Sequence, residues 1–248
     1  MQQYTYLLIL FFTIIICFLF SFHHKIKFNR HFGAFLGGSS MVAVVFIIWD
    51  AWFTKRGIWW FNDDYLLGFR ILGLPIEEIL FFICIPFSCL FTYFCLDKFF
   101  RLDWKPVPEK IFVIISIAAA LGIALYFNDR IYTFMTFLTT AISLFVLYFI
   151  LKVQWIGKAS LIYLLLMPGF LAVNGILTGT GLESPIVNYT PGTFMGIRLL
   201  TIPLEDTAYG YEMILWNIYL FKKFSKNEQS TKDGKDQYIL VQEGPEAG

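Results

Sequence analysis

The sequence predicts an all-α integral membrane protein, with seven transmembrane helices in a 3+1+3 parallel-repeat bundle. The first observation is composition, because 58% of the 248 residues are hydrophobic, 15% are charged, and the mean hydropathy is +0.66. The second is that these apolar residues form long runs without the alternating pattern of a transmembrane β-barrel. The third is a short acidic motif that occurs twice, four crossings apart, so that both copies have the same orientation in the bilayer.

Each transmembrane helix is expected where an apolar run reaches about 20 residues, the length that spans a bilayer. The seven runs cover 4–22, 33–53, 75–96, 111–127, 131–151, 158–178 and 203–221. We expect a first repeat at 1–110, a linking helix at 111–130 and a second repeat at 131–224. Residues 225–248 are polar and are expected to form a mobile cytoplasmic tail.

The orientation in the membrane follows from the basic residues of the connecting segments. Fourteen of the 19 lysines and arginines fall on the side that carries the C-terminus. This side of the cell (inner) membrane is therefore expected to face the cytoplasm. The N-terminus is expected on the outer side of the same membrane. The first run lacks a preceding basic segment, so we expect a retained helix rather than a cleaved signal. The net charge of +1 gives no reason to expect a nucleic-acid partner; the expected surroundings are the lipid bilayer.

The repeated motif places two carboxylates at the start of an apolar helix. The first copy reads Gly68-x-Arg70-x4-Pro75-x-Glu77-Glu78, and the second reads Gly196-x-Arg198-x4-Pro203-x-Glu205-Asp206. Both prolines are expected in the first helical turn, where a backbone N–H has no hydrogen-bond partner within the helix. Ionisable residues inside membrane helices are costly and usually functional, so the four acids are candidate catalytic residues. The plainer alternative is capping of the helix dipole.

Further polar residues are expected at the same depth as the acids. Asp50 and Asn174 are equivalent in the two repeats, and each lies near the outer end of its helix. A shared depth favours one polar cluster inside the bundle. Arg70 and Arg198 are expected to hold a carboxylate of the motif by a charge-assisted pair. Alternatively, both arginines are ordinary residues of the aqueous boundary.

One face of the last helix carries a third acid. Tyr209 and Glu212 follow Glu205 by four and seven residues, so all three lie on the same helix face. Glu212 is either a second functional acid or a hydrogen-bonded structural group. The aromatic segment 52–61 is either an interfacial belt, the common role of Trp and Tyr at a membrane surface, or the wall of an apolar pocket.

Several other chemistries do not fit the sequence. The Gly179-Thr180-Gly181 segment follows no predicted strand, so it is not a dinucleotide-binding turn. The four cysteines lie in apolar runs without a CxxC pair, and the three histidines are too few for a di-iron oxidase. The run 203–221 contains no lysine for a retinal Schiff base. We therefore expect no cofactor and no metal.

The duplicated Pro-x-Glu-[Glu/Asp] motif with its upstream Gly-x-Arg resembles the heterodimeric-type lycopene cyclase family. The resemblance covers about residues 1–224. In that family the two repeats are separate subunits in some bacteria, fused in other organisms, and joined to a synthase in fungi. The resemblance implies a lycopene or related carotenoid substrate, whose ψ end groups become β-ionone rings to give γ-carotene and β-carotene without a flavin.

The acid motifs suit this chemistry, because cyclisation needs a proton donor and a proton acceptor but no net change of electrons. One carboxyl group protonates an alkene, the cation closes on a second alkene, and a base removes a proton. Two alternatives remain: a small-solute transporter with 3+1+3 repeats, and a related carotenoid or isoprenoid hydratase or isomerase.

Overall fold

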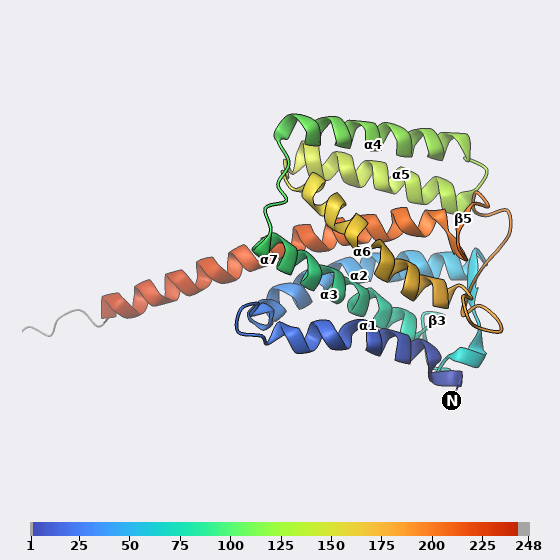
Figure 1. Cartoon of the computed structure of the whole chain (residues 1–248), viewed down its shortest axis with the longest axis horizontal. Coiled ribbons are helices and arrows are strands. Elements are labelled where there is room, and N and C mark those ends of the chain that lie inside the picture. Colours follow the sequence, from blue (N-terminus) through green and yellow to red (C-terminus); the bar gives the residue numbers. More distant parts are fainter. Residues whose placement is uncertain (1, 243–248) are drawn as a thin grey trace, which may run out of the picture.

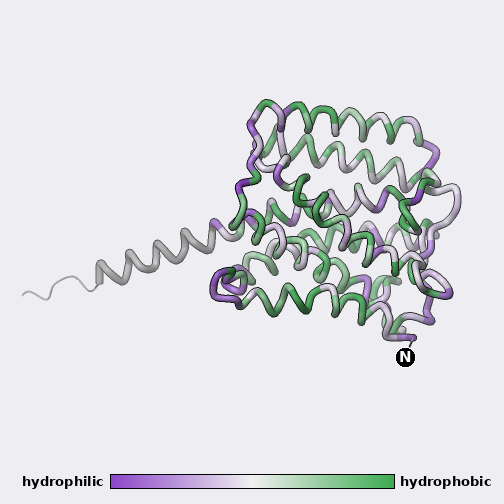
Figure 2. The backbone as a smooth tube through the Cα atoms, in the orientation of Figure 1, coloured by the Kyte–Doolittle hydropathy of each residue, from purple (hydrophilic) through white to green (hydrophobic). Residues whose placement is uncertain are grey.

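The computed structural model describes the backbone of residues 2–242 and the side chains of residues 2–226. The described chain is mainly helical, and the helices run side by side along the length of the bundle (Figure 1). Short strand pairs gather at the end of the bundle where α3 and α7 begin. Apolar residues predominate along the helices, while hydrophilic residues concentrate in the connections at both ends (Figure 2).

The long helices agree closely with the predicted runs. They are α1 Thr5–Ser21, α2 Phe32–Lys55, α3 Ile76–Phe99, α4 Pro106–Tyr126, α5 Ile131–Phe145, α6 Ile156–Leu177 and α7 Leu204–Gln242. A π-helical segment, Val146–Ile150, continues α5, and the 3-10 turns are Gln2–Tyr4, Phe28–His31 and Asp63–Tyr65. Helix α4 begins five residues before the predicted run. Its first turn is polar, so the apolar run did not include it. Pro106 fits the first helical position, where a backbone N–H would have no partner within the helix.

Six helices in the described part of the chain, α1 to α6, are long and apolar enough to cross a membrane. Helix α7, the predicted seventh span, is not among them, because Glu205, Asp206 and Glu212 lower the hydropathy of its apolar segment. All three carboxylates are buried within the bundle. The predicted mobile tail continues α7 as a helix to Gln242, and residues 243–248 lie outside the described residues.

The sequence did not predict the three small antiparallel strand pairs. Strand β1 (Trp59–Phe61) pairs with β4 (Val187–Tyr189) and joins the loops of the two halves. Strand β2 (Arg70–Ile71) pairs with β3 (Leu74–Pro75), and β5 (Arg198–Leu199) pairs in the same register with β6 (Ile202–Pro203). Each of the last two hairpins leads directly into a helix that carries an acid pair.

The two halves of the chain pack against each other through α7. Helix α7 runs through the middle of the bundle, with α4 and α5 on one side and α1 and α3 on the other (Figure 1). Helix α2 lies in close contact along α7, whereas α6 makes only sparse contact with α3. By the match of Asp50 with Asn174, α6 is the counterpart of α2, so equivalent helices pack differently in the two halves.

A glycine allows the close approach of α2 to α7. A Cβ atom at Gly38 would lie 3.1 Å from the backbone nitrogen of Phe221 and 3.2 Å from the carbonyl carbon of Leu220. Small residues at helix contacts in membranes permit this kind of packing. One residue further along α2, buried Ser39 donates a 2.6 Å hydrogen bond to Asn217 of α7. In α6, Ile162 takes the place of Gly38, and its bulk does not permit such an approach.

We expect Gly38→Val to destabilise the protein by about 1–3 kcal/mol, because the added methyl groups have no space between two helix backbones. Melting in detergent, followed by fluorescence-detected size exclusion, measures the effect. The matched control is Gly122→Val in α4, where a Cβ atom would meet no other atom within 4 Å. Equal melting temperatures for the two variants would contradict the tight α2–α7 contact.

Candidate active site

Each acid pair is positioned by the hairpin that precedes it. The backbone N–H of Ile76 donates to the carbonyl of Phe69 at 2.9 Å, and Leu204 donates to Ile197 at 3.0 Å. The hairpin therefore uses the first N–H of the helix and fixes the direction in which the helix leaves. Pro75 has extended backbone angles, φ −60° and ψ 148°, and caps α3 rather than lying in its first turn.

The predicted position of the prolines is thus wrong by one residue in both repeats. Pro75 and Pro203 are the last residues of β3 and β6, where they pair with Arg70 and Arg198. Proline fits these last strand positions because its φ angle suits extended backbone as well as the start of a helix. The residue after each proline is the first residue of the helix.

The first acid of each pair binds the loop backbone. Glu77 accepts a 2.6 Å hydrogen bond from the N–H of Leu67, and Glu205 accepts one of 2.7 Å from Met195. The hydroxyl of Thr133 also donates to Glu205 at 2.5 Å. Both acidic side chains are fully buried. Their equivalent contacts show that Glu77 and Glu205 hold the preceding loop against the helix.

The second acid of each pair faces a cavity and accepts from tyrosines. Tyr6 donates to Glu78 at 2.5 Å. Asp206 accepts from Tyr132 at 2.5 Å and from Tyr189 at 2.7 Å. Burial, together with the neighbouring Asp206, raises the pKa of Tyr189 well above its usual value. The phenol of Tyr189 therefore keeps its proton and remains a donor.

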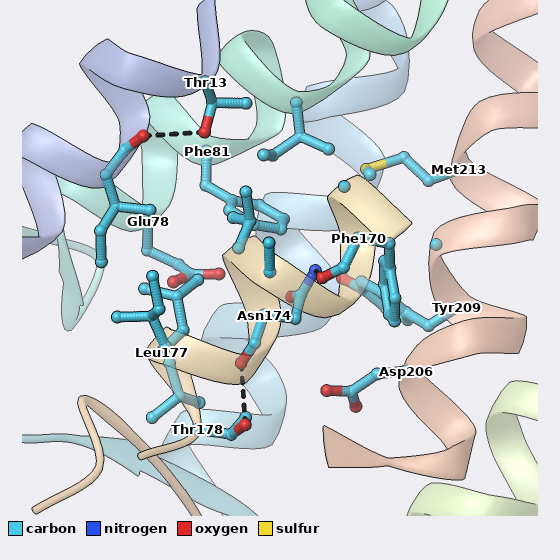
Figure 3. A pocket seen from close by; sticks show the side chains of 18 of the residues that line it. Thr13, Glu78, Phe81, Phe170, Asn174, Leu177, Thr178, Asp206, Tyr209 and Met213 are labelled. Carbon is cyan, nitrogen blue, oxygen red and sulfur yellow. Dashed lines mark hydrogen bonds between the residues drawn. The ribbon is translucent and has the colours of Figure 1, made fainter. Parts of the chain in front are cut away.

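The cavity has a volume of about 670 Å³ and lies between α1, α3, α6 and α7. Glu78 and Asp206 lie on opposite sides of the residues that α6 contributes, which include Phe170 and Asn174 (Figure 3). Acids of the first and second halves of the chain therefore share one chamber. Apolar side chains of the four helices form most of its wall, among them Leu8, Ile9, Phe12, Phe81, Ile85, Leu166, Val173, Met213 and Ile214.

Three other residues predicted for the site also line this cavity: Asp50, Asn174 and Tyr209. Asp50 accepts a 2.5 Å hydrogen bond from the indole N–H of Trp59, which is itself part of the wall. Asn174 donates to the carbonyl of Phe170 within its own helix at 3.2 Å. The structure thus brings Asp50 and Asn174 into one chamber with the second acids.

Aromatic rings surround the acidic end of the cavity. The ring of Trp59 lies 5.2 Å from Tyr132, 6.1 Å from Tyr189 and 6.4 Å from Tyr209, all in edge-to-face arrangements. Tyr209 also packs edge-to-face against Trp49, at 5.6 Å. Part of the aromatic segment 52–61 is therefore a cavity wall rather than an interfacial belt.

The arginines do not contact the acid pairs, which corrects the prediction that they orient the carboxylates. Arg70 forms a 2.6 Å ion pair with Asp63 and donates to the carbonyl of Gly73 at 2.9 Å. Arg198 donates to the carbonyl of Thr201 and lies 4.9 Å from the ring centre of Phe194. Both arginines close their own hairpin at the exposed end of the bundle, as residues of the aqueous boundary do.

Glu212 lies outside the cavity wall. It accepts hydrogen bonds from Ser143 at 2.7 Å and from Thr139 at 2.9 Å, both in α5. Trp216 in turn donates to Ser143 at 2.9 Å. Of the two predicted alternatives, this geometry favours the structural one, in which Glu212 ties α7 to α5.

The sequence prediction missed the tyrosines that bind the second acids. Tyr6 and Tyr132 lie near the starts of α1 and α5, the first helix of each half, so alignment of those two starts is the signal that would have found them. Tyr189 lies in a loop strand and reaches Asp206 only through the β1–β4 pairing. No spacing in the sequence indicates that contact.

The comparisons with known proteins agree with this geometry. The family model described as "Lycopene cyclase" matches residues 3–96 and 129–224, which contain both acid motifs and leave out all of α4. The bifunctional lycopene cyclase/phytoene synthase of Podospora anserina is 33% identical over 67 residues, a match that covers 26% of this chain and 11% of that protein. No solved structure matches the chain. Since the family match covers well over half of the sequence, the protein belongs to the lycopene cyclase family.

Proposed function

We propose that the protein is a lycopene β-cyclase that converts the ψ end groups of lycopene to β-ionone rings, giving γ-carotene and then β-carotene. The observation that carries this proposal is the single apolar cavity into which both Glu78 and Asp206 point. Membership of the lycopene cyclase family supports a carotenoid substrate. The reaction is an isomerisation, so the chain's own acids and bases suffice.

The two cavity carboxyls divide the proton transfers between them. Hydrogen bonds from O–H groups stabilise the charged form of a carboxyl group. Asp206 accepts from two phenols, whereas Glu78 accepts from one. We therefore assign Glu78 as the acid that protonates the terminal alkene. Asp206 is the base that takes a proton from the cyclised cation, so the carotenoid gains one proton and loses one. A proton then passes from Asp206 back to Glu78 before the next cyclisation.

The aromatic wall protects and stabilises the cation between these two steps. The faces of Trp and Tyr rings attract positive charge, and four such rings meet at the acidic end: Trp59, Tyr132, Tyr189 and Tyr209. Most of the remaining wall is apolar, so few sites hold a water molecule that could convert the cation to an alcohol. This favours cyclisation over hydration.

The transporter alternative is less well supported. A transporter binds its solute near the bilayer midplane between broken helices. Here the carboxylates gather at the hairpin end of the bundle, where α3 and α7 begin. A polar solute would also cross a largely apolar wall.

We further propose that α7 is a seventh membrane span and that the chain follows the 3+1+3 plan. The family match divides into two segments, one at α1–α3 and one at α5–α7. The β1–β4 pair supports a twofold relation, because the two equivalent loops pair with each other. Most lysines and arginines of the connecting segments lie on the side opposite the hairpins that precede α3 and α7. This excess supports an N-terminus outside the cell membrane and a cytoplasmic C-terminus.

The central prediction separates the two acids within each pair. Glu78→Gln and Asp206→Asn should each lower cyclisation by at least about 100-fold, because each removes a group that transfers a proton. Glu77→Gln and Glu205→Gln should stay within about ten-fold of wild type, since an amide oxygen still accepts from the loop N–H. Chromatography of pigments from a lycopene-producing bacterium measures the products.

Immunoblotting of membranes controls for the amount of each variant in that experiment. The assignment is wrong if Glu78→Gln and Asp206→Asn form cyclic carotenoids at wild-type rates. An alcohol in place of a ring would identify a hydratase.

The reaction should need no added cofactor, because protonation and deprotonation leave the electron count unchanged. Purified protein in detergent should convert lycopene to cyclic products without flavin or nicotinamide. The Glu78→Gln protein, prepared in parallel, controls for non-enzymatic cyclisation. A strict requirement for reduced flavin would contradict the proposed mechanism.

Neither half of the chain should be active alone, because α1 and α3 form one side of the cavity and α6 and α7 form the other. Residues 1–127 and 128–248 divide the chain in the α4–α5 connection. Expressed together in lycopene-producing cells, the two fragments should restore cyclisation at least in part. Cyclisation by one fragment alone would show that each half holds its own site.

A further inference from the structure

The exposed residues of the cavity wall lie on α1 and α6, which indicates that the cavity reaches the surface between these two helices. At this opening the apolar side chains of α1 are well exposed, with Leu8 at 49% and Phe12 at 67%. The wall residues Gly169 and Ala172 of α6 are exposed as well. Both helices are long and apolar enough to cross a membrane, so their exposed apolar surfaces are suited to lipid. The opening therefore connects the chamber with the hydrocarbon region of a bilayer.

The passage from this opening to the acids offers few free hydrogen-bonding groups. Thr13 donates to the carbonyl of Ile9 at 2.7 Å, and Ser88 donates to the carbonyl of Thr13 at 2.8 Å. Thr92 likewise donates to the carbonyl of Ser88 at 2.9 Å. Because each of these hydroxyls already donates to a helix carbonyl, the passage suits a ligand without polar groups.

The opening exists on the α6 side because the two halves of the chain pack differently. On the equivalent side, α2 lies against α7 with Gly38 in contact with helix backbone. Helix α6 has Leu161 and Ile162 at the positions that correspond to Gly37 and Gly38, and Pro168 interrupts its hydrogen-bond ladder. Helix α6 makes only sparse contact with α3, and the cavity occupies space between these two helices.

Gly169 lies beside this opening with free space around it. It follows Pro168, lines the cavity and is exposed, and a Cβ atom there would meet no atom within 4 Å. By contrast, a Cβ at Gly210, which also lines the cavity, would lie 3.0 Å from the hydroxyl of Tyr163. A side chain can therefore be added at Gly169 without a clash at its Cβ atom, at a position that both lines the cavity and is exposed.

We propose that an extended isoprenoid chain enters the cavity end first from the bilayer, between α1 and α6, and that Gly169 keeps this entrance open. The inference rests on the proposed function, since it concerns how the carotenoid reaches Glu78 and Asp206. The end group enters first because the carboxylates lie at the inner end of the cavity and the apolar walls lead to them. The rest of the chain remains between the exposed faces of α1 and α6.

The test measures entry separately from catalysis. Lycopene quenches tryptophan fluorescence by energy transfer, and the part of the quenching that is lost in a parallel Trp59→Phe protein reports arrival in the cavity, because Trp59 lies in its wall. Stopped-flow mixing of lycopene with detergent-purified protein gives the association rate. All proteins carry Glu78→Gln, so no turnover alters the ligand during the measurement. Gly169→Phe should lower the association rate by about ten-fold or more, with a much smaller change in the final extent of quenching.

The matched control is Gly122→Phe in α4, which is also exposed and also has no atom within 4 Å of an added Cβ. Its association rate should equal that of the parent. Ala172→Phe, at the same opening, should slow association as Gly169→Phe does, which keeps the test valid if one variant misfolds.

Each other outcome of this experiment overturns a specific claim. If Gly169→Phe and Ala172→Phe both melt like the parent and bind lycopene as fast, the α1–α6 entrance is wrong while the proposed function stands. If the parent protein binds no lycopene, the proposed function fails and the entrance fails with it.

Discussion

The structure depends on how loop N–H groups bind one oxygen of a buried carboxylate at the start of each of two apolar helices. Glu77 and Glu205 each receive a backbone N–H from the loop that precedes the hairpin. A buried carboxyl group without such donors would be strongly destabilising in a membrane, so the loop and helix are held in one arrangement. This arrangement turns the adjacent Glu78 and Asp206 toward the interior. The structural role of the first acid thus places the second in the cavity wall.

The departure from twofold symmetry is as important as the repeat itself. In a fully symmetric bundle, α2 and α6 would pack alike. Instead, Gly38 allows α2 to fill its side of α7, whereas Leu161 and Ile162 hold α6 away from α3. Acids of both repeats line one cavity. Two copies of one motif thus place two different carboxylates, Glu78 and Asp206, in the same cavity wall.

The sequence predicted the helices and the place of the acid pairs at the start of two of them, but not what each acid contacts. Apart from the start of α4 and the end of α7, the apolar runs gave the helix positions to within a few residues, because the bilayer requires long apolar segments. The matched spacing of the repeats predicted that Asp50 and Asn174 would join the acids. Spacing did not reveal that Arg70 binds Asp63, because charge pairing depends on loop conformation and on which side chains reach water. The roles of Glu77 and Glu78 also differ only because neighbouring helix positions face different directions.

By itself, then, the sequence determined the helical membrane class, the internal repeat and the set of acids, since these follow from composition and periodicity along the chain. The tertiary structure decided which acid of each pair faces the cavity, which tyrosines donate to it and where the cavity opens. Those features depend on contacts between segments far apart in the chain, such as Tyr6 with Glu78 and β1 with β4. The physical reason is that local patterns encode which surfaces must be buried, whereas the partner of each buried group is fixed only when the helices pack.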